Sequence, residues 1–121
     1  MRYMMMIYSQ ETADAHSPEE LQALMKAHGA VMEDATQKGV LRGVEKLKSI
    51  TTATTVRMNG GGAITTDGPF AETKEQLAGY YILECQNLDE AIEWAARIPT
   101  SCRGNAGCVE IRPIDEIPRR L

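Results

Sequence analysis

The sequence predicts a single α+β domain over residues 1–121, and three observations lead to this fold class. Two segments with strand-like composition are apolar at nearly every position. Two other segments repeat apolar residues at helical spacing. The order along the chain is strand, helix, strand with an extra hairpin, strand, helix, strand, which is the ferredoxin-like split β-α-β sandwich with an added β-hairpin.

The first strand and the first helix have the clearest signals. Residues 2–8, RYMMMIY, form a continuous apolar run, which indicates a strand covered on both faces. Ser17 is a good helix N-cap, Pro18 suits the first turn and Glu20 completes a capping box. Gly39 is placed to end the helix in a left-handed cap. The apolar stripe of this helix is expected to comprise Leu21, Leu24, Met25, His28, Met32 and Ala35.

The middle of the chain predicts three shorter strands. Residues 40–47 form a weaker strand candidate, and residues 51–58 are rich in β-branched side chains. NGGG at 59–62 predicts a hairpin turn, from which residues 63–66 return as the partner strand. A turn at Asp67 and a polar link then lead to the next strand.

The last third of the chain predicts strand, helix and strand. Residues 78–85 have no clear polar face, and Asn87 caps a second helix that Pro99 ends. Residues 108–114 alternate apolar and charged side chains, as in a half-buried strand. The expected buried stripe of the second helix is Leu88, Ala91, Ile92, Ala95 and Ile98.

Two helices cover only one face of a sheet of this kind. Residues 3–8 and 80–83 are apolar on both sides, so the second face also needs cover. A second copy of the same sheet provides it. We therefore predict a homodimer, packed sheet against sheet about a two-fold axis.

Composition excludes several classes of protein. The net charge is −4 and the pI about 5.2, which disfavours nucleic-acid and anionic-membrane binding. No run approaches the roughly 18 apolar residues of a membrane span. The odd set Cys85, Cys102 and Cys108 has no C-x-x-C pair, so we expect reduced thiols, no metal site and a cytoplasmic location. No motif indicates an organic cofactor; NGGG lacks the remainder of a phosphate-binding loop.

Three strings carry a resemblance to a known family. DGPFAETKEQLAGYYILE, LDEAIEWAARIP and VEIRPI resemble the YCII-related family, specifically its DGPF-domain branch. The resemblance covers nearly the whole chain. It implies a ferredoxin-like domain that pairs through its sheets, and a pocket lined by a histidine and an aspartate that match His28 and Asp67. It also implies a possible association with alternative sigma factors, beside which some members are encoded.

His28 and Asp67 have both a chemical and a structural interpretation. A carboxylate beside the imidazole would fix its tautomer and raise its pKa, which gives a general acid or base. Alternatively, His28 is a packed histidine with one hydrogen bond, and Asp67 opens a turn by accepting a hydrogen bond from the backbone two residues on. Phe70 would then fill the core or the dimer interface.

Further candidates surround this pair. Glu72 and Lys74 are either a solvated loop or the rim of a site that binds an anionic group. Tyr8 and Tyr80 are either packing residues or hydroxyl groups that bind substrate. His16, just before the helix cap, is expected to be exposed.

Three functions remain open. The first is a small-molecule enzyme without an organic cofactor, in which His28 and Asp67 transfer protons. The second is a ligand-binding or regulatory module that binds a transcription-linked partner. The third is a dimeric scaffold whose pocket is vestigial.

Overall fold

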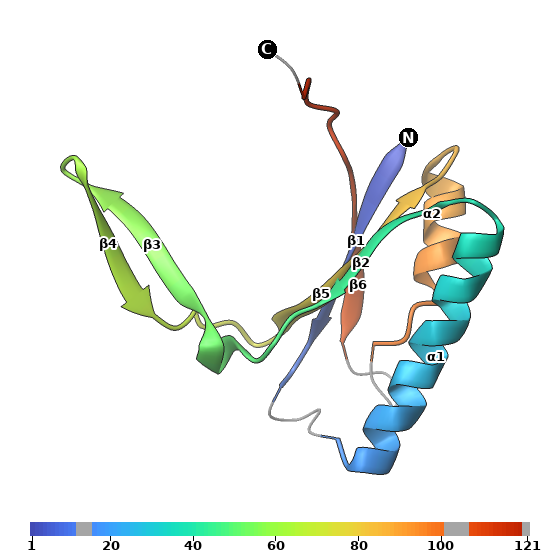
Figure 1. Cartoon of the computed structure of the whole chain (residues 1–121), viewed down its shortest axis with the longest axis horizontal. Coiled ribbons are helices and arrows are strands. Elements are labelled where there is room, and N and C mark those ends of the chain that lie inside the picture. Colours follow the sequence, from blue (N-terminus) through green and yellow to red (C-terminus); the bar gives the residue numbers. More distant parts are fainter. Residues whose placement is uncertain (12–15, 101–106, 120–121) are drawn as a thin grey trace.

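The computed structural model describes residues 1–11, 16–100 and 107–119, and it confirms the α+β fold. A four-stranded sheet carries both helices on one face, and a separate two-stranded hairpin projects from it (Figure 1). The sheet order is β2-β5-β1-β6 with antiparallel neighbours, which is the ferredoxin-like order. The elements are β1 (Arg2–Ser9), α1 (Pro18–Gln37), β2 (Leu41–Lys46), the 3₁₀ turn η1 (Ile50–Thr52), β3 (Thr54–Asn59), β4 (Gly62–Asp67), β5 (Gln76–Glu84), α2 (Leu88–Ala95) and β6 (Cys108–Pro113).

Helix α1 begins and ends where the sequence predicts. The backbone N–H of Glu20 donates to Ser17 Oγ at 3.1 Å, and the Glu20 carboxylate accepts from the Ser17 N–H at 3.1 Å, which completes the capping box. Gly39 has a φ of 72°, the left-handed conformation that ends helices. Within the described residues, neither helix has the length and apolar character needed to cross a bilayer.

The core lies between the sheet and the helices. Alternation along β1 and β5 turns every second side chain toward α1 and α2. The largest fully buried side chains are those of Tyr81, Met5, Leu83 and Cys85. Cys102 lies outside the described residues.

Helix α2 buries only part of the predicted stripe: Ala91 is fully buried and Ala95 packs against the core, as predicted. Leu88 and Ile92 are 52% and 49% exposed, whereas Trp94 is only 6% exposed. The helix ends at Ala95, and Ile98 is buried in the turn that follows it. The large indole therefore sets the orientation of this short helix, and the buried side rotates away from the two aliphatic positions.

The segment 51–58 is only partly a strand. Residues 50–52 form η1, because the Ser49 side chain accepts from the Thr51 N–H at 3.2 Å and caps the turn. Strand β3 begins at Thr54. The predicted hairpin turn is confirmed: Gly60 and Gly61 both have positive φ, 60° and 91°.

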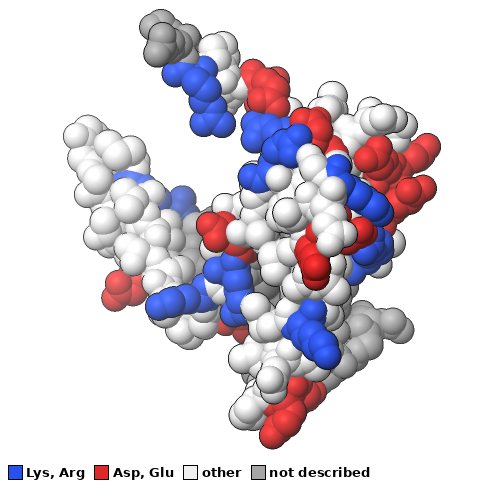
Figure 2. Space-filling model, turned by 45° about the vertical axis from the view of Figure 1, so that its right-hand side comes forward, with Lys and Arg blue, Asp and Glu red and all other residues white. Residues whose placement is uncertain are grey.

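Strands β3 and β4 form an arm that stands away from the sheet (Figure 1). Of their twelve residues, all but Thr55 are exposed to solvent. Within the span 54–67 the only charged residues are Arg57 and Asp67. Figure 2 shows the arm as a mostly uncharged projection, separated from the body of the molecule.

The sheet face opposite the helices is apolar at its centre. Met4 pairs with Ile82 across the β1–β5 ladder, and Met6 pairs with Tyr80. All four are half-buried, and no helix lies over this face (Figure 1). This is the face for which we predicted a second sheet, and the pairing itself stays a prediction. Phe70 is 76% exposed, so its predicted place in the core is wrong.

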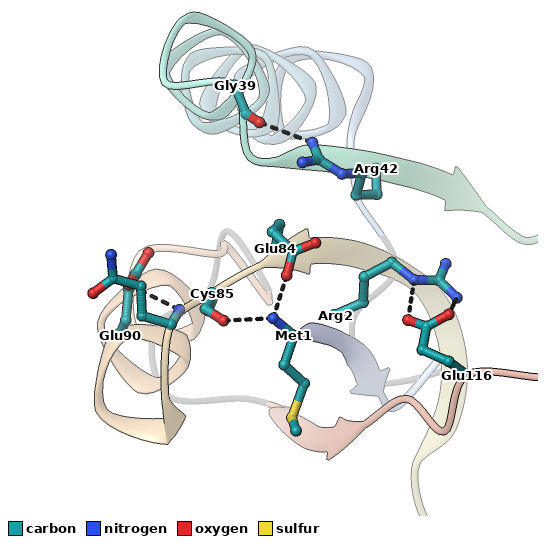
Figure 3. A network of polar contacts seen from close by, with 9 residues as sticks. Met1, Arg2, Gly39, Arg42, Glu84, Cys85, Glu90 and Glu116 are labelled. Carbon is teal, nitrogen blue, oxygen red and sulfur yellow. Dashed lines mark hydrogen bonds and ion pairs between the residues drawn. The ribbon is translucent and has the colours of Figure 1, made fainter.

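Polar contacts fasten the segment that follows β6 to the start of β1. The Arg2 guanidinium donates to both carboxylate oxygens of Glu116, at 2.8 and 3.0 Å (Figure 3). Nearby, the amine of Met1 donates to the Cys85 carbonyl and pairs with Glu84. These exposed contacts lie at the Arg2 end of β1, whereas Ile7 and Ser9 line the cavity described below.

Candidate functional site

A cavity of about 420 Å³ lies between α1 and the helix-covered face of the sheet. It is lined by the end of β1, one side of α1, the ends of β2 and β5 and the turn around Pro99. Its walls are mostly apolar because the alternation of the strands and the inner side of α1 both present aliphatic side chains here. The main apolar contributors are Ile7, Leu24, Met25, Met32, Val44 and Leu47.

Two polar side chains meet within this apolar lining. Nδ1 of His28, on α1, lies 2.7 Å from the hydroxyl oxygen of Tyr81, on β5. Their rings are stacked at 24°, with centroids 5.9 Å apart. Tyr81 is 1% exposed, whereas His28 is only half-buried. The helix and the sheet thus bring an imidazole to the cavity and hold it by a buried phenol.

Burial keeps both groups uncharged near neutral pH. Desolvation lowers the pKa of His28 below its ordinary value and raises the pKa of Tyr81 to about 12. The Tyr81 O–H is therefore protonated, and a buried O–H needs an acceptor. Among the described residues, its acceptor is His28 Nδ1. Taking Tyr81 as the donor of this hydrogen bond places the proton of the neutral imidazole on Nε2.

The mouth of the cavity is fastened by Glu11. Its carboxylate accepts hydrogen bonds from Ser49 Oγ at 2.8 Å and from the Ile50 N–H at 2.9 Å. The Glu11 N–H in turn donates to the Gln76 side chain at 3.0 Å. The charge of Glu11 is thus used to hold η1 against the ends of β1 and β5.

Of the two predicted catalytic residues, only His28 lines the cavity. Asp67 is exposed at the end of β4, where it pairs with Thr54. The DGPF corner is held by backbone: the Gly68 N–H donates to Ala53 O at 2.7 Å, and Gly68 has a φ of 95°. The prediction that Asp67 accepts a turn hydrogen bond from the backbone two residues on is wrong, because the residue at that place is Pro69, which has no N–H to donate.

The predicted substrate-binding residues also lie outside the cavity lining. Tyr8 and Tyr80 alternate with residues that line the cavity, so they lie on the opposite face of the sheet. Glu72 and Lys74 are exposed in the link before β5. Their binding roles stay predictions, without support from the cavity described here.

His28 is the only predicted site residue in the lining, and the residues that the prediction missed include Tyr81, Glu11 and His16. The alternation of residues 79–83 carries a signal for Tyr81, because it places Tyr81 with Leu83 on the buried face. His16 is half-buried and lines the cavity, so the prediction that it is exposed is wrong. No pattern before the helix cap indicates this.

A second hollow beside α2 is a weaker candidate site. It is lined by Lys38, Trp94 and Arg97, together with acidic side chains of the helix. Both cations lie over the indole ring, 5.4 and 4.8 Å from its centroid, and both pair with Asp34. Its two cations are thus already paired. In the described ranges, no three His, Cys, Asp or Glu side chains group as metal ligands do.

Comparison with known proteins identifies the family. The family model of the YCII-related domain matches residues 1–118. The chain belongs to the YCII-related domain family. The match includes every element that forms the cavity. This YCII-related chain is also 38% identical over 115 residues to an uncharacterized protein of Rhizobium meliloti (strain 1021), covering 94% of this chain and 92% of that protein.

Proposed function

We propose that this YCII-related protein is a small-molecule enzyme in which His28 transfers a proton to or from a bound substrate. The observation that carries the proposal is the placement of His28, hydrogen-bonded to Tyr81, in a largely apolar cavity of about 420 Å³. Cavities of this size and character are typical of small-molecule sites. The residues 67–70, DGPF, further support membership of the DGPF-domain branch.

The state of His28 suits acid–base chemistry. A lowered pKa leaves the imidazole neutral at physiological pH, where it can take a proton from a substrate as a general base; the imidazolium so formed can then return that proton as a general acid, without an organic cofactor. Lyase, isomerase and hydrolase reactions all use such a group. We propose Asp67 as the second acid–base group; because it lies outside the cavity of its own chain, this role requires movement of the arm or a second copy.

We also propose that two copies pair through the open sheet face. Met4, Met6, Tyr80 and Ile82 are only half-buried on this face, which supports the pairing, because a second sheet would remove their remaining apolar surface from water. We expect Ile82→Glu to yield monomers by light scattering at micromolar concentration. The matched variant Ile92→Glu, on the exposed side of α2, should leave the dimer intact. A monomeric wild type would refute the pairing.

A ligand screen tests the enzyme proposal. Metabolites are screened by thermal shift against wild type, and those that bind are assayed for turnover. A true substrate should stabilise wild type, and His28→Ala should abolish its turnover. If His28→Ala binds and converts the same compound as well as wild type, the proposal is wrong. Asp67→Ala, tested in parallel, reports on the second acid–base group.

The arm favours a second candidate function, a regulatory module associated with an alternative sigma factor. One side of the arm carries Val56, Met58 and Ala63, of which Val56 and Met58 are 60% and 73% exposed. An isolated two-stranded hairpin is marginally stable in water, which supports a partner for this surface. Capture of a sigma factor by wild type, lost in Met58→Ser while the dimer persists, would support this role. Loss of the dimer in Met58→Ser would assign the arm to self-association instead.

A further inference from the structure

We infer that the cavity selects an uncharged, mainly apolar molecule with a carbonyl oxygen, and that this oxygen accepts a hydrogen bond from Nε2 of His28. The inference rests on the proposed function in one respect, since it treats this cavity as the substrate site. It goes further by naming the chemical class of the ligand and the atom that recognises it.

The inner part of the cavity offers no permanent charge to an ion. His28 and Tyr81 are both neutral near pH 7. The Glu11 carboxylate is occupied by Ser49 and Ile50, and the remaining charged residues of the lining, Glu45 and Lys46, are exposed near the end of β2. An ionised ligand in the apolar part would lose hydration without gaining a counter-charge, whereas a neutral ligand loses little.

The hydrogen-bond network sets what the ligand must present. The Tyr81 hydroxyl lies 2.7 Å from Nδ1 of His28 and is protonated near pH 7; taking it as the donor of this hydrogen bond places the proton of the neutral ring on Nε2. Among the described residues, no hydrogen bond occupies Nε2, and the His28 side chain is half-buried in the cavity lining. A hydrogen-bond donor that faces an apolar cavity favours a ligand with a hydrogen-bond acceptor. A carbonyl oxygen accepts and does not donate, which matches this single N–H.

The volume sets the size of the apolar part. An apolar cavity of about 150 Å³ binds benzene. The present cavity, of about 420 Å³, therefore has room for a molecule of one or two rings, or for a branched chain of similar bulk. Its walls of leucine, isoleucine, valine and methionine match such a body. Met25 and Met32 are flexible side chains that adjust to its shape.

A probe series of matched size tests the inference. Acetophenone, benzoate, benzylammonium and ethylbenzene share one ring and differ in charge and in the carbonyl oxygen. Each is titrated at pH 7.5 into the full-length protein while the methyl signals of Met25 and Met32 are followed by NMR. We expect acetophenone to bind at least tenfold more tightly than either ion, and more tightly than ethylbenzene. Equal or tighter binding of benzoate would overturn the selection of neutral ligands.

Two variants test the hydrogen bond. In His28→Leu, the preference for acetophenone over ethylbenzene should disappear while ethylbenzene still binds. In the matched variant His16→Leu, which changes the other histidine of the lining, the preference should remain. The opposite pattern would overturn the assignment to His28. Binding of the neutral probes without any turnover would refute the proposed enzyme and leave this inference intact. Turnover of a carboxylate substrate would support the proposed enzyme and overturn the selection of neutral ligands.

Discussion

Replacement of Tyr81 by phenylalanine isolates the contact that holds His28. The substitution removes one hydroxyl and leaves the ring in place, so the core stays filled. The lost hydrogen bond, 2.7 Å long, contributes about 1 kcal/mol to the free energy of unfolding at pH 7. His28 is half-buried and can regain part of this from water in the cavity, which makes about 1 kcal/mol an upper value. A cost near the 3–5 kcal/mol of a large core truncation would mean that the core had rearranged.

The same variant has a pH dependence of defined sign. Folding raises the pKa of Tyr81 from 10 to about 12, so the unfolded chain releases this proton first as the pH rises. Wild type therefore loses stability above pH 10, and the loss from this residue reaches about 1.4 kcal/mol at pH 11. Tyr81→Phe lacks this loss. The stability advantage of wild type over Tyr81→Phe should thus fall from about 1 kcal/mol at pH 7 and reverse by about 0.4 kcal/mol near pH 11, where the variant becomes slightly more stable.

Urea unfolding at both pH values measures this difference. Trp94 is the single tryptophan and is 6% exposed, so its fluorescence reports on the loss of the folded state. Both proteins are compared at one concentration, since self-association would shift the midpoint. If the free energies of unfolding of wild type and Tyr81→Phe differ by the same amount at pH 7 and pH 11, the assignment of Tyr81 as a buried, protonated phenol is refuted.

Three other changes have defined expectations. Gly79→Ala should lower the free energy of unfolding by about 1–3 kcal/mol, because the new Cβ would lie 2.5 Å from the Glu45 carbonyl oxygen. Gly29→Ala in α1 should raise the free energy of unfolding by about 0.5–1 kcal/mol, because its Cβ would meet no atom within 4 Å. Urea unfolding that ranks the two variants in the opposite order would contradict this packing. Glu11→Gln should loosen η1 and lower the free energy of unfolding by about 1–2 kcal/mol, and unchanged amide exchange in residues 50–52 would argue against this fastening. Burial lowers the pKa of His28 below the unfolded value of 6.5, so wild type should lose stability as the pH falls from 6.5 to the folded pKa. His28→Gln should not show the loss of stability that comes from this histidine. Identical profiles of unfolding free energy against pH for the two proteins would contradict the lowered pKa.

The fold was predictable because strong local signals agreed with one another. The capping box at Ser17, the left-handed Gly39 and the Gly60–Gly61 turn all occur where the sequence indicates them. Helix α2 was less predictable, because Leu88 and Trp94 compete for burial and tertiary packing decides between them. Residues 50–52 form the turn η1 because the neighbouring Ser49 side chain caps it and the carboxylate of Glu11 holds it from a distance; strand propensity contains no information on the second contact.

The site was only half predictable. His28 was found from its place on the apolar stripe of the first helix. Its partner was missed because adjacent strand residues face opposite sides: the prediction named Tyr80, while Tyr81 reaches the cavity. Asp67 follows the added hairpin, whose position relative to the sheet depends on no local signal.

The most direct test of this account is the protonation of the His28 ring, read from the nitrogen shifts of the imidazole by NMR in the full-length protein. The protein has two histidines, so His16→Gln leaves His28 as the only signal. The account predicts a bare Nδ1, a proton on Nε2 and a pKa below 6.5. A proton on Nδ1, or a pKa above 6.5, would contradict the neutral donor that faces the cavity.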